Sequence, residues 1–111
     1  MTTPPPAISP SMSEALGRLW TKFRPEIENR ITALETAAEA LVSGSLSEEQ
    51  REAAHQAAHK LAGVLGTFGL HRGTDLARQV ELELAEAVPA SAVADLSEWI
   101  AELRLLVDDR K

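Results

Sequence analysis

The sequence of 111 residues contains no cysteine and no tyrosine, and aromatic residues make up only 4% of it. Without cysteine the chain cannot form a disulfide bond or use a thiol in chemistry, which fits a reducing compartment. With so few aromatic residues, the core must be built from Leu, Ile, Val and Ala. That composition favours packed helices over a sheet, so we expect an all-α protein.

The chain also lacks the patterns of several function classes. It has no apolar run of about 18 residues and no signal-peptide pattern, so we expect no membrane span and a cytoplasmic location. It has no Gly-rich phosphate loop, so it should not bind ATP or act as an ATP-dependent kinase. A formal net charge of −6 argues against DNA or RNA as its principal ligand.

Proline divides the chain into a tail and one domain. Residues 1–10 hold four of the six prolines and no charged side chain, so we expect a flexible tail there and a single domain over residues 11–111. Residues 11–14, SMSE, match a capping box, which predicts the start of a first helix. Pro25 should stop or kink that helix, because proline lacks the N–H that an interior helical residue donates.

Four longer stretches carry apolar residues at helical spacing. They cover about residues 25–42, 47–68, 71–87 and 91–108, with a second capping box at residues 47–50 and glycine stops at Gly44 and Gly69. Short connections between long amphipathic helices favour antiparallel neighbours. The sequence therefore predicts an antiparallel up-down four-helix bundle, with the short N-terminal helix lying across one end.

His59 occupies an unusual place in the third of these stretches. At about 100° per residue, it lies opposite an apolar arc centred on Leu61, and Gly63 and Gly66 follow it on the outer face. A glycine inside a helix costs roughly 1 kcal/mol relative to alanine. We infer that the two glycines leave room for another molecule to approach His59 closely.

The run AHKLAGVLGTFGL at residues 58–70, followed by LARQVE at residues 76–81, resembles the signature of the histidine phosphotransfer (HPt) domain of bacterial phosphorelays. The chain differs from many members of that family at Ala62 and Val64, where they carry Lys and Ser. The matching positions are His59, Leu61, Gly63, Gly66, Phe68, Leu76 and Glu81.

The resemblance implies a phosphorelay intermediate in which His59 accepts and returns a phosphoryl group. Its partners would be response-regulator receiver domains and a hybrid histidine kinase, and the receiver would supply the divalent metal ion, with no cofactor or metal on this chain. We expect a monomer, with Lys60 as a candidate for neutralising phosphate oxygens. The expected receiver-docking surface comprises His55, Gln56, Gly63, Gly66 and Thr67.

The charge distribution agrees with an acidic partner, since all three histidines and a small positive balance lie within residues 53–80 of an otherwise acidic chain. Two other readings stay open. His55 and His59 are four residues apart and could share a zinc ion, with His71 or scattered acids completing the site. Alternatively, the bundle binds receiver domains without being phosphorylated.

Overall fold

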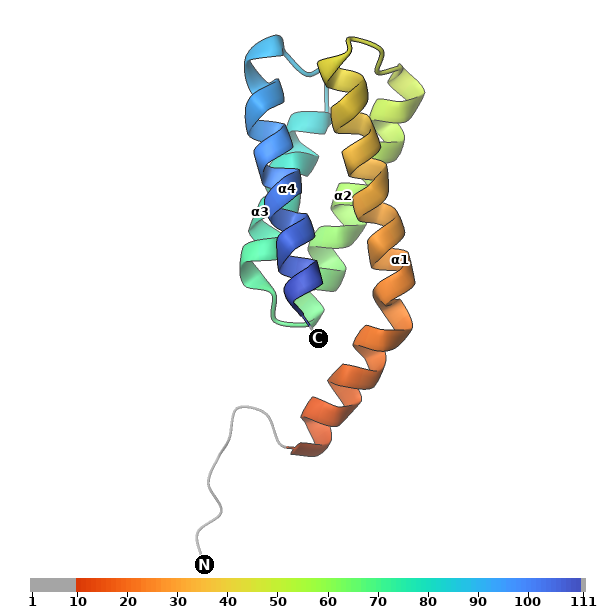
Figure 1. Cartoon of the computed structure of the whole chain (residues 1–111), viewed down its shortest axis with the longest axis vertical. Helices are drawn as coiled ribbons and strands as arrows, with labels where there is room; N and C mark the ends of the chain where they lie inside the picture. The colour runs from red at the N-terminus through yellow and green to blue at the C-terminus, as the bar shows by residue number, and fades with distance from the viewer. Residues whose placement is uncertain (1–9, 111) are drawn as a thin grey trace, which may run out of the picture.

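The computed structural model describes residues 10–110, and within that range it is built from four α-helices and one short 3₁₀ helix (Figure 1). The main packing contacts join α1 to α2, α2 to α3, α3 to α4, and α4 back to α1. The predicted all-α four-helix bundle is therefore confirmed. The elements are α1 (Pro10–Val42), α2 (Glu48–Thr67), α3 (His71–Leu84), η1 (Ala90–Ala92) and α4 (Val93–Asp109).

The core is aliphatic, as the low aromatic content predicts. Each of the four helices contributes Leu, Ile or Val side chains that are fully buried. The two buried aromatic rings meet at one end of the bundle, where Trp20 packs edge-on against Phe68 with 5.1 Å between ring centroids. The fully buried large side chains are Ile27, Ile31, Leu34, Leu61, Leu65, Leu76, Val80, Leu84, Leu96, Leu103 and Val107.

The prediction of a separate N-terminal helix across one end is wrong. Pro25 lies inside α1, which is a single helix of 33 residues, and its N-terminal part projects past the end of the bundle (Figure 1). Proline removes one intrahelical hydrogen bond, but burial of Trp20 before Pro25 and of Ile27 after it holds both sides of Pro25 in helical conformation. Ser11 consequently lies within the helix, and of the predicted tail only Pro10 falls among the described residues.

The predicted signals at both ends of α2 are confirmed. Ser47 accepts a hydrogen bond from the Gln50 backbone while the Gln50 side chain accepts one from the Ser47 N–H, which completes a capping box. Gly44 and Gly69 follow α1 and α2 with φ of 70° and 74°, the left-handed conformation of a glycine helix stop.

The expected extension of α3 to residue 87 is not observed, because α3 ends at Leu84 and Ala87 is exposed. Pro89 accounts for the early end. It cannot donate to the Ala85 carbonyl, and it disfavours helical conformation at Val88.

Polar side chains tie α4 to its neighbours. Arg104 donates to Glu35 of α1 at 2.7 Å, and it also contacts Glu28 and Thr32 of the same helix. Hydrogen bonding to Glu35 and Glu28 raises the pKa of Arg104 further above its already high ordinary value. On the other side, Arg72 of α3 donates two hydrogen bonds to Glu102, which lowers the pKa of that carboxyl group.

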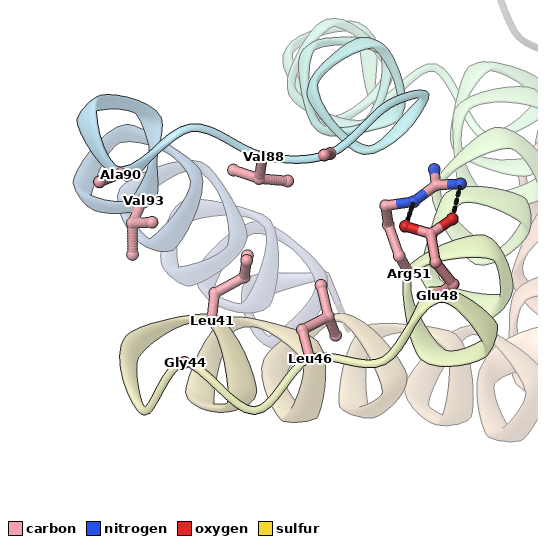
Figure 2. A pocket seen from close by; sticks show the side chains of 9 residues that line it. Leu41, Gly44, Leu46, Glu48, Arg51, Val88, Ala90 and Val93 are labelled. Carbon is pink, nitrogen blue, oxygen red and sulfur yellow. Dashed lines mark hydrogen bonds and ion pairs between the residues drawn. The ribbon is translucent and has the colours of Figure 1, made fainter.

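The α1–α2 and α3–α4 connections lie at the end of the bundle opposite the projecting part of α1 (Figure 1). A hollow lies between these two connections (Figure 2). Leu41, Leu46, Val88 and Val93 line it, with the Arg51–Glu48 ion pair at its edge. None of the predicted site residues lines this hollow. In the described part of the chain, no helix has the length and apolar character needed to cross a membrane.

The Arg104 contacts generate a stability prediction. Arg104→Ala should lower the free energy of unfolding by about 1–2 kcal/mol, because Glu28 and Glu35 lose their shared cation in a partly buried place. Urea unfolding measures this change. Arg30→Ala is the matched control, since within residues 10–110 Arg30 pairs only with Glu26 of the same helix, and it should cost less than about 0.5 kcal/mol. Equal losses in the two variants would contradict this role of Arg104.

Candidate functional site

His59 lies in the middle of α2 and faces away from the core, as the helical spacing predicts. Its side chain is 65% exposed, whereas Leu61 and Leu65 on the opposite side of the helix are completely buried. The ring is therefore accessible to a large partner approaching the outer face of α2.

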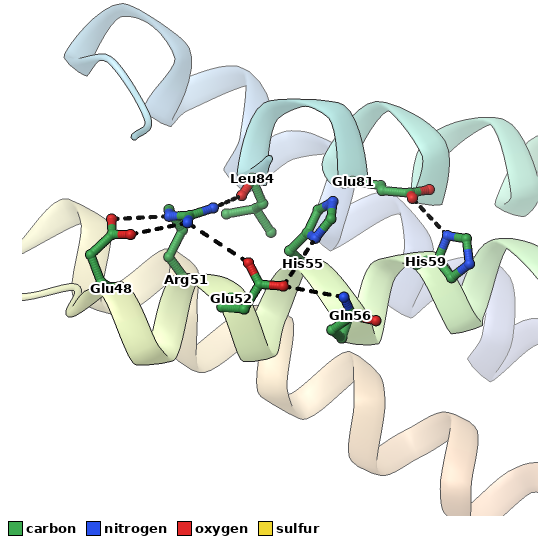
Figure 3. A network of polar contacts seen from close by, with 8 residues as sticks. All are labelled: Glu48, Arg51, Glu52, His55, Gln56, His59, Glu81 and Leu84. Carbon is green, nitrogen blue, oxygen red and sulfur yellow. Dashed lines mark hydrogen bonds and ion pairs between the residues drawn. The ribbon is translucent and has the colours of Figure 1, made fainter. Parts of the chain in front are cut away.

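One side chain from another helix orients the His59 ring. Nδ1 of His59 lies 2.7 Å from Oε2 of Glu81 on α3 (Figure 3). An ionised carboxylate only accepts hydrogen bonds, so this contact requires the proton on Nδ1. In the neutral ring, Nε2 then carries the free lone pair and is the nucleophilic nitrogen.

Close packing of α2 against α3 places Glu81 beside His59. The buried Thr74 donates from Oγ1 to the Ala62 carbonyl at 3.2 Å, which links the two helices near their shared turn. Glu81 follows Thr74 by seven residues, about two helical turns, so both side chains lie on the α2 side of α3. The Thr74 contact thus sets the rotation of α3 that brings Glu81 to His59.

The two glycines after His59 have different surroundings. A Cβ at Gly63 would meet no atom within 4 Å, so this position leaves the outer face beside His59 open. A Cβ at Gly66 would lie 3.3 Å from Thr74 Oγ1, tighter than ordinary contact. Gly63 fits the inferred need for access, whereas Gly66 also serves the packing of α3 on α2.

The other predicted site residues are spread over the outer face and the α2–α3 groove. Lys60 is exposed, Gln56 donates to Glu52 at 3.2 Å, and Thr67 donates to the Gly63 carbonyl at 3.3 Å. His55 is less accessible, with a side chain only 22% exposed and a buried Nδ1 that has no hydrogen-bond partner among residues 10–110.

His55 and His59, the pair considered for zinc binding, each lie nearest to a different carboxylate side chain. His55 Nδ1 lies 3.7 Å from Glu52, beyond hydrogen-bonding distance, while His59 Nδ1 contacts Glu81 (Figure 3). In the described part of the chain, no group of three or more His, Cys, Asp or Glu side chains is arranged to hold a metal ion. His71 lies apart from the pair, at the first position of α3.

Two residues of this site have roles that reasoning from the residues did not assign. Glu81 is a matching position of the family signature, but the sequence alone gives its side chain no role, and it gives none to Thr74. Twenty-two residues separate His59 from Glu81, so helical spacing carries no signal for their contact. The sequence gives one signal for a role of Thr74: it is a polar residue next to the apolar positions of α3.

The family model of the Hpt domain matches residues 18–110, which include most of α1 and the whole of α2, α3 and α4. The chain belongs to the HPt domain family. Comparison with curated proteins and with solved structures found no match. HPt domains take part in phosphotransfer in two-component signalling, where they interact with receiver domains and kinases. In this HPt domain, the projecting start of α1 before Arg18 lies outside the family match.

The two glycine environments generate opposite stability predictions. Gly63→Ala should raise the free energy of unfolding by about 0.5–1 kcal/mol, because alanine is the better helix former and its methyl group meets no neighbour. Gly66→Ala should give a smaller gain or a loss, since its methyl group crowds Thr74. Urea unfolding of both variants tests the pair, and an equal gain at both positions would contradict the packing role of Gly66.

The His59–Glu81 contact generates a prediction about the imidazole tautomer. In the wild-type protein at alkaline pH, ¹⁵N chemical shifts should show His59 mainly as the Nδ1–H form. Glu81→Ala should shift the population towards the Nε2–H form, because the acceptor that holds the Nδ1 proton is lost. Glu86→Ala, which removes an exposed carboxylate beyond the end of α3, is the control and should leave the His59 shifts unchanged. Unchanged shifts in Glu81→Ala would rule out this role of Glu81.

Proposed function

We propose that this HPt domain is a phosphorelay intermediate in which Nε2 of His59 accepts a phosphoryl group from a receiver aspartyl phosphate and returns it to another receiver aspartate. The observation that carries the proposal is the pairing of an exposed His59 with a Glu81 carboxylate on Nδ1. That pairing directs the nucleophilic lone pair to Nε2, and the open backbone at Gly63 supports close approach by a second protein.

The proposed transfer needs no general base on this chain. The Nε2 lone pair attacks phosphorus, an N–P bond forms, and the bond from phosphorus to the aspartyl oxygen breaks, so that the aspartate leaves as a carboxylate. The ring keeps its Nδ1 proton and gains positive charge, which the Glu81 carboxylate stabilises through its hydrogen bond. The reverse sequence passes the phosphoryl group on to the next aspartate.

The remaining parts of the reaction are divided between this chain and its partner. Phosphoryl transfer depends mainly on in-line positioning and on neutralising the phosphate oxygens. Lys60, exposed and adjacent to His59, is our candidate for one neutralising cation, and a divalent metal ion on the receiver would supply the rest. His55, Gln56 and Thr67 would contact the partner around the edge of this surface, with Gly63 and Gly66 below it.

Phosphotransfer profiling tests the proposal. Wild-type protein and a His59→Gln variant are incubated with labelled phospho-receivers of the source organism and separately with phosphoramidate, a small-molecule phosphoryl donor. We expect label on the wild type that is stable in alkali and lost in acid, and a decrease of at least about 100-fold in His59→Gln, because the nucleophile is absent. Circular dichroism checks that the variant stays helical.

His71→Gln is the matched control, because it removes an exposed histidine at the start of α3 and leaves His59 intact. It should accept phosphate at the wild-type rate. Label on His59→Gln would contradict the assignment of His59. If the wild type accepts no phosphate from any donor, yet binds receivers as tightly as His59→Gln does, the protein is a receiver-binding module.

A further inference from the structure

The N-terminal part of α1 differs in charge from the rest of the protein. Residues 10–24 contain three cationic side chains against the single anion Glu14, in a chain whose net charge is −6. Arg24 forms an ion pair with Glu28, whereas Arg18 and Lys22 are exposed and make no ion pair within residues 10–110. This end of α1 therefore presents two cations that no internal acid neutralises.

These cations lie on the side of α1 that adjoins α2. Ala33 and Ala37 mark this side, because they line a shallow hollow together with Ala53 and Ala54 of α2. Lys22 precedes Ala33 by eleven residues, about three helical turns, and Leu19 precedes Ala37 by eighteen residues, about five turns. Arg18 likewise precedes Thr36, which lines the same hollow, by eighteen residues. Arg18, Leu19 and Lys22 therefore share the α2 side of α1.

On α2, Lys60 faces the same junction from the opposite direction. It follows Ala53 by seven residues, about two turns, so it lies on the α1 side of α2. Trp20 packs against Phe68 at the end of α2, which places Lys22 beside the last turn of that helix. Lys60, Lys22 and Arg18 thus form a basic strip that leads from His59 to the projecting part of α1.

The strip has only a small apolar component. Trp20 is 2% exposed, and Leu16 and Phe23 pack against the core, but Leu19 is 40% exposed and Met12, two helical turns before it, is 53% exposed. Two exposed apolar side chains beside the cations are too little apolar surface to hold a membrane helix or a stable dimer. They suit the edge of a polar interface with an acidic protein.

The basic strip is close enough to His59 for one partner domain to contact both. Nine residues of α2 separate His59 from Phe68, about 14 Å at 1.5 Å per residue. A partner domain of about 100 residues has a radius of gyration of about 13 Å, so a domain centred on His59 extends over the end of α2. A partner that exchanges a phosphoryl group with His59 therefore meets the strip in the same encounter.

We propose that Arg18, Leu19, Lys22 and Lys60 form a docking strip for the acidic surface of the receiver domain that exchanges phosphoryl groups with His59. This inference rests on the proposed function and extends it by naming a partner-binding element outside the phosphate site, part of it at the start of α1. Arg18, Leu19 and Lys22 raise the encounter rate and the affinity and take no part in the chemical step, whereas Lys60 also adjoins the phosphate site.

The test uses the receiver that gives the fastest transfer in the profiling experiment. In Arg18→Gln/Lys22→Gln, the second-order rate constant of transfer at low salt should fall about ten-fold, while the rate at saturating receiver stays within two-fold of wild type. The difference should shrink towards none near 0.5 M salt, because exposed charges are then screened. Leu19→Gln should give a smaller loss that persists at high salt.

Gln79→Glu/Ala94→Glu is the matched control, since it lowers the net charge by the same two units at exposed positions on α3 and α4, outside the strip. It should transfer within two-fold of the wild-type rate. An equal loss in the control would show a general charge effect and overturn the inference, as would a wild-type rate in Arg18→Gln/Lys22→Gln at low salt.

Phosphoramidate separates this inference from the proposed function, because it phosphorylates His59 without any docking partner. All strip variants should accept phosphate from it at the wild-type rate. If the wild type is not phosphorylated by phosphoramidate, the proposed function and the strip are both overturned. If the wild type is phosphorylated but the strip variants exchange phosphate with the receiver at the wild-type rate, only the strip is overturned. Flotation of the wild type with phosphatidylserine vesicles, or dimerisation in sedimentation experiments, lost in Arg18→Gln/Lys22→Gln, would assign the strip to another occupant.

Discussion

The hydrogen bond from Thr74 Oγ1 to the Ala62 carbonyl holds α3 against α2 across positions where two glycines leave room for close approach. At Gly66 a methyl group would crowd Thr74, and at Gly73 it would lie 3.1 Å from Leu65. With these contacts made, the α2-facing side of α3 has one rotation, and Glu81 falls beside His59. A bundle with looser packing here would leave the histidine exposed but without a partner that selects its tautomer.

The two sides of α2 are built for different tasks. The inner side is buried aliphatic surface, which is tightly packed and resists displacement. On the outer side, glycine at position 63 lowers the stability of the helix, although no neighbouring atom in the fold requires glycine there. In the proposed function another protein must reach His59, and both features serve this, because a rigid helix fixes the position of the ring and an unobstructed backbone lets a partner approach it.

Reasoning from the sequence succeeded where the signal is local. The capping box at Ser47 and Gln50, the glycine stops and the outward direction of His59 depend only on residues a few positions apart, and all three are observed. It failed at Pro25, because the preference of proline against helix was outweighed by burial of Trp20 against a residue 48 positions away. The extent of α3 was overestimated because apolar spacing continues past Leu84 although the backbone cannot continue ahead of Pro89.

The sequence by itself determined the helical class, the approximate bounds of α2 and α4, and the histidine on the outer face, since helical periodicity is a property of neighbouring residues. Only the tertiary structure decided that Glu81 accepts the hydrogen bond from Nδ1 of His59, and that Thr74 leaves little room for a side chain at position 66. It also decided that α1 runs unbroken past the end of the bundle. Those features come from contacts between helices, whose relative rotation depends on how whole side-chain surfaces fit together. No periodic pattern within a single helix encodes that fit.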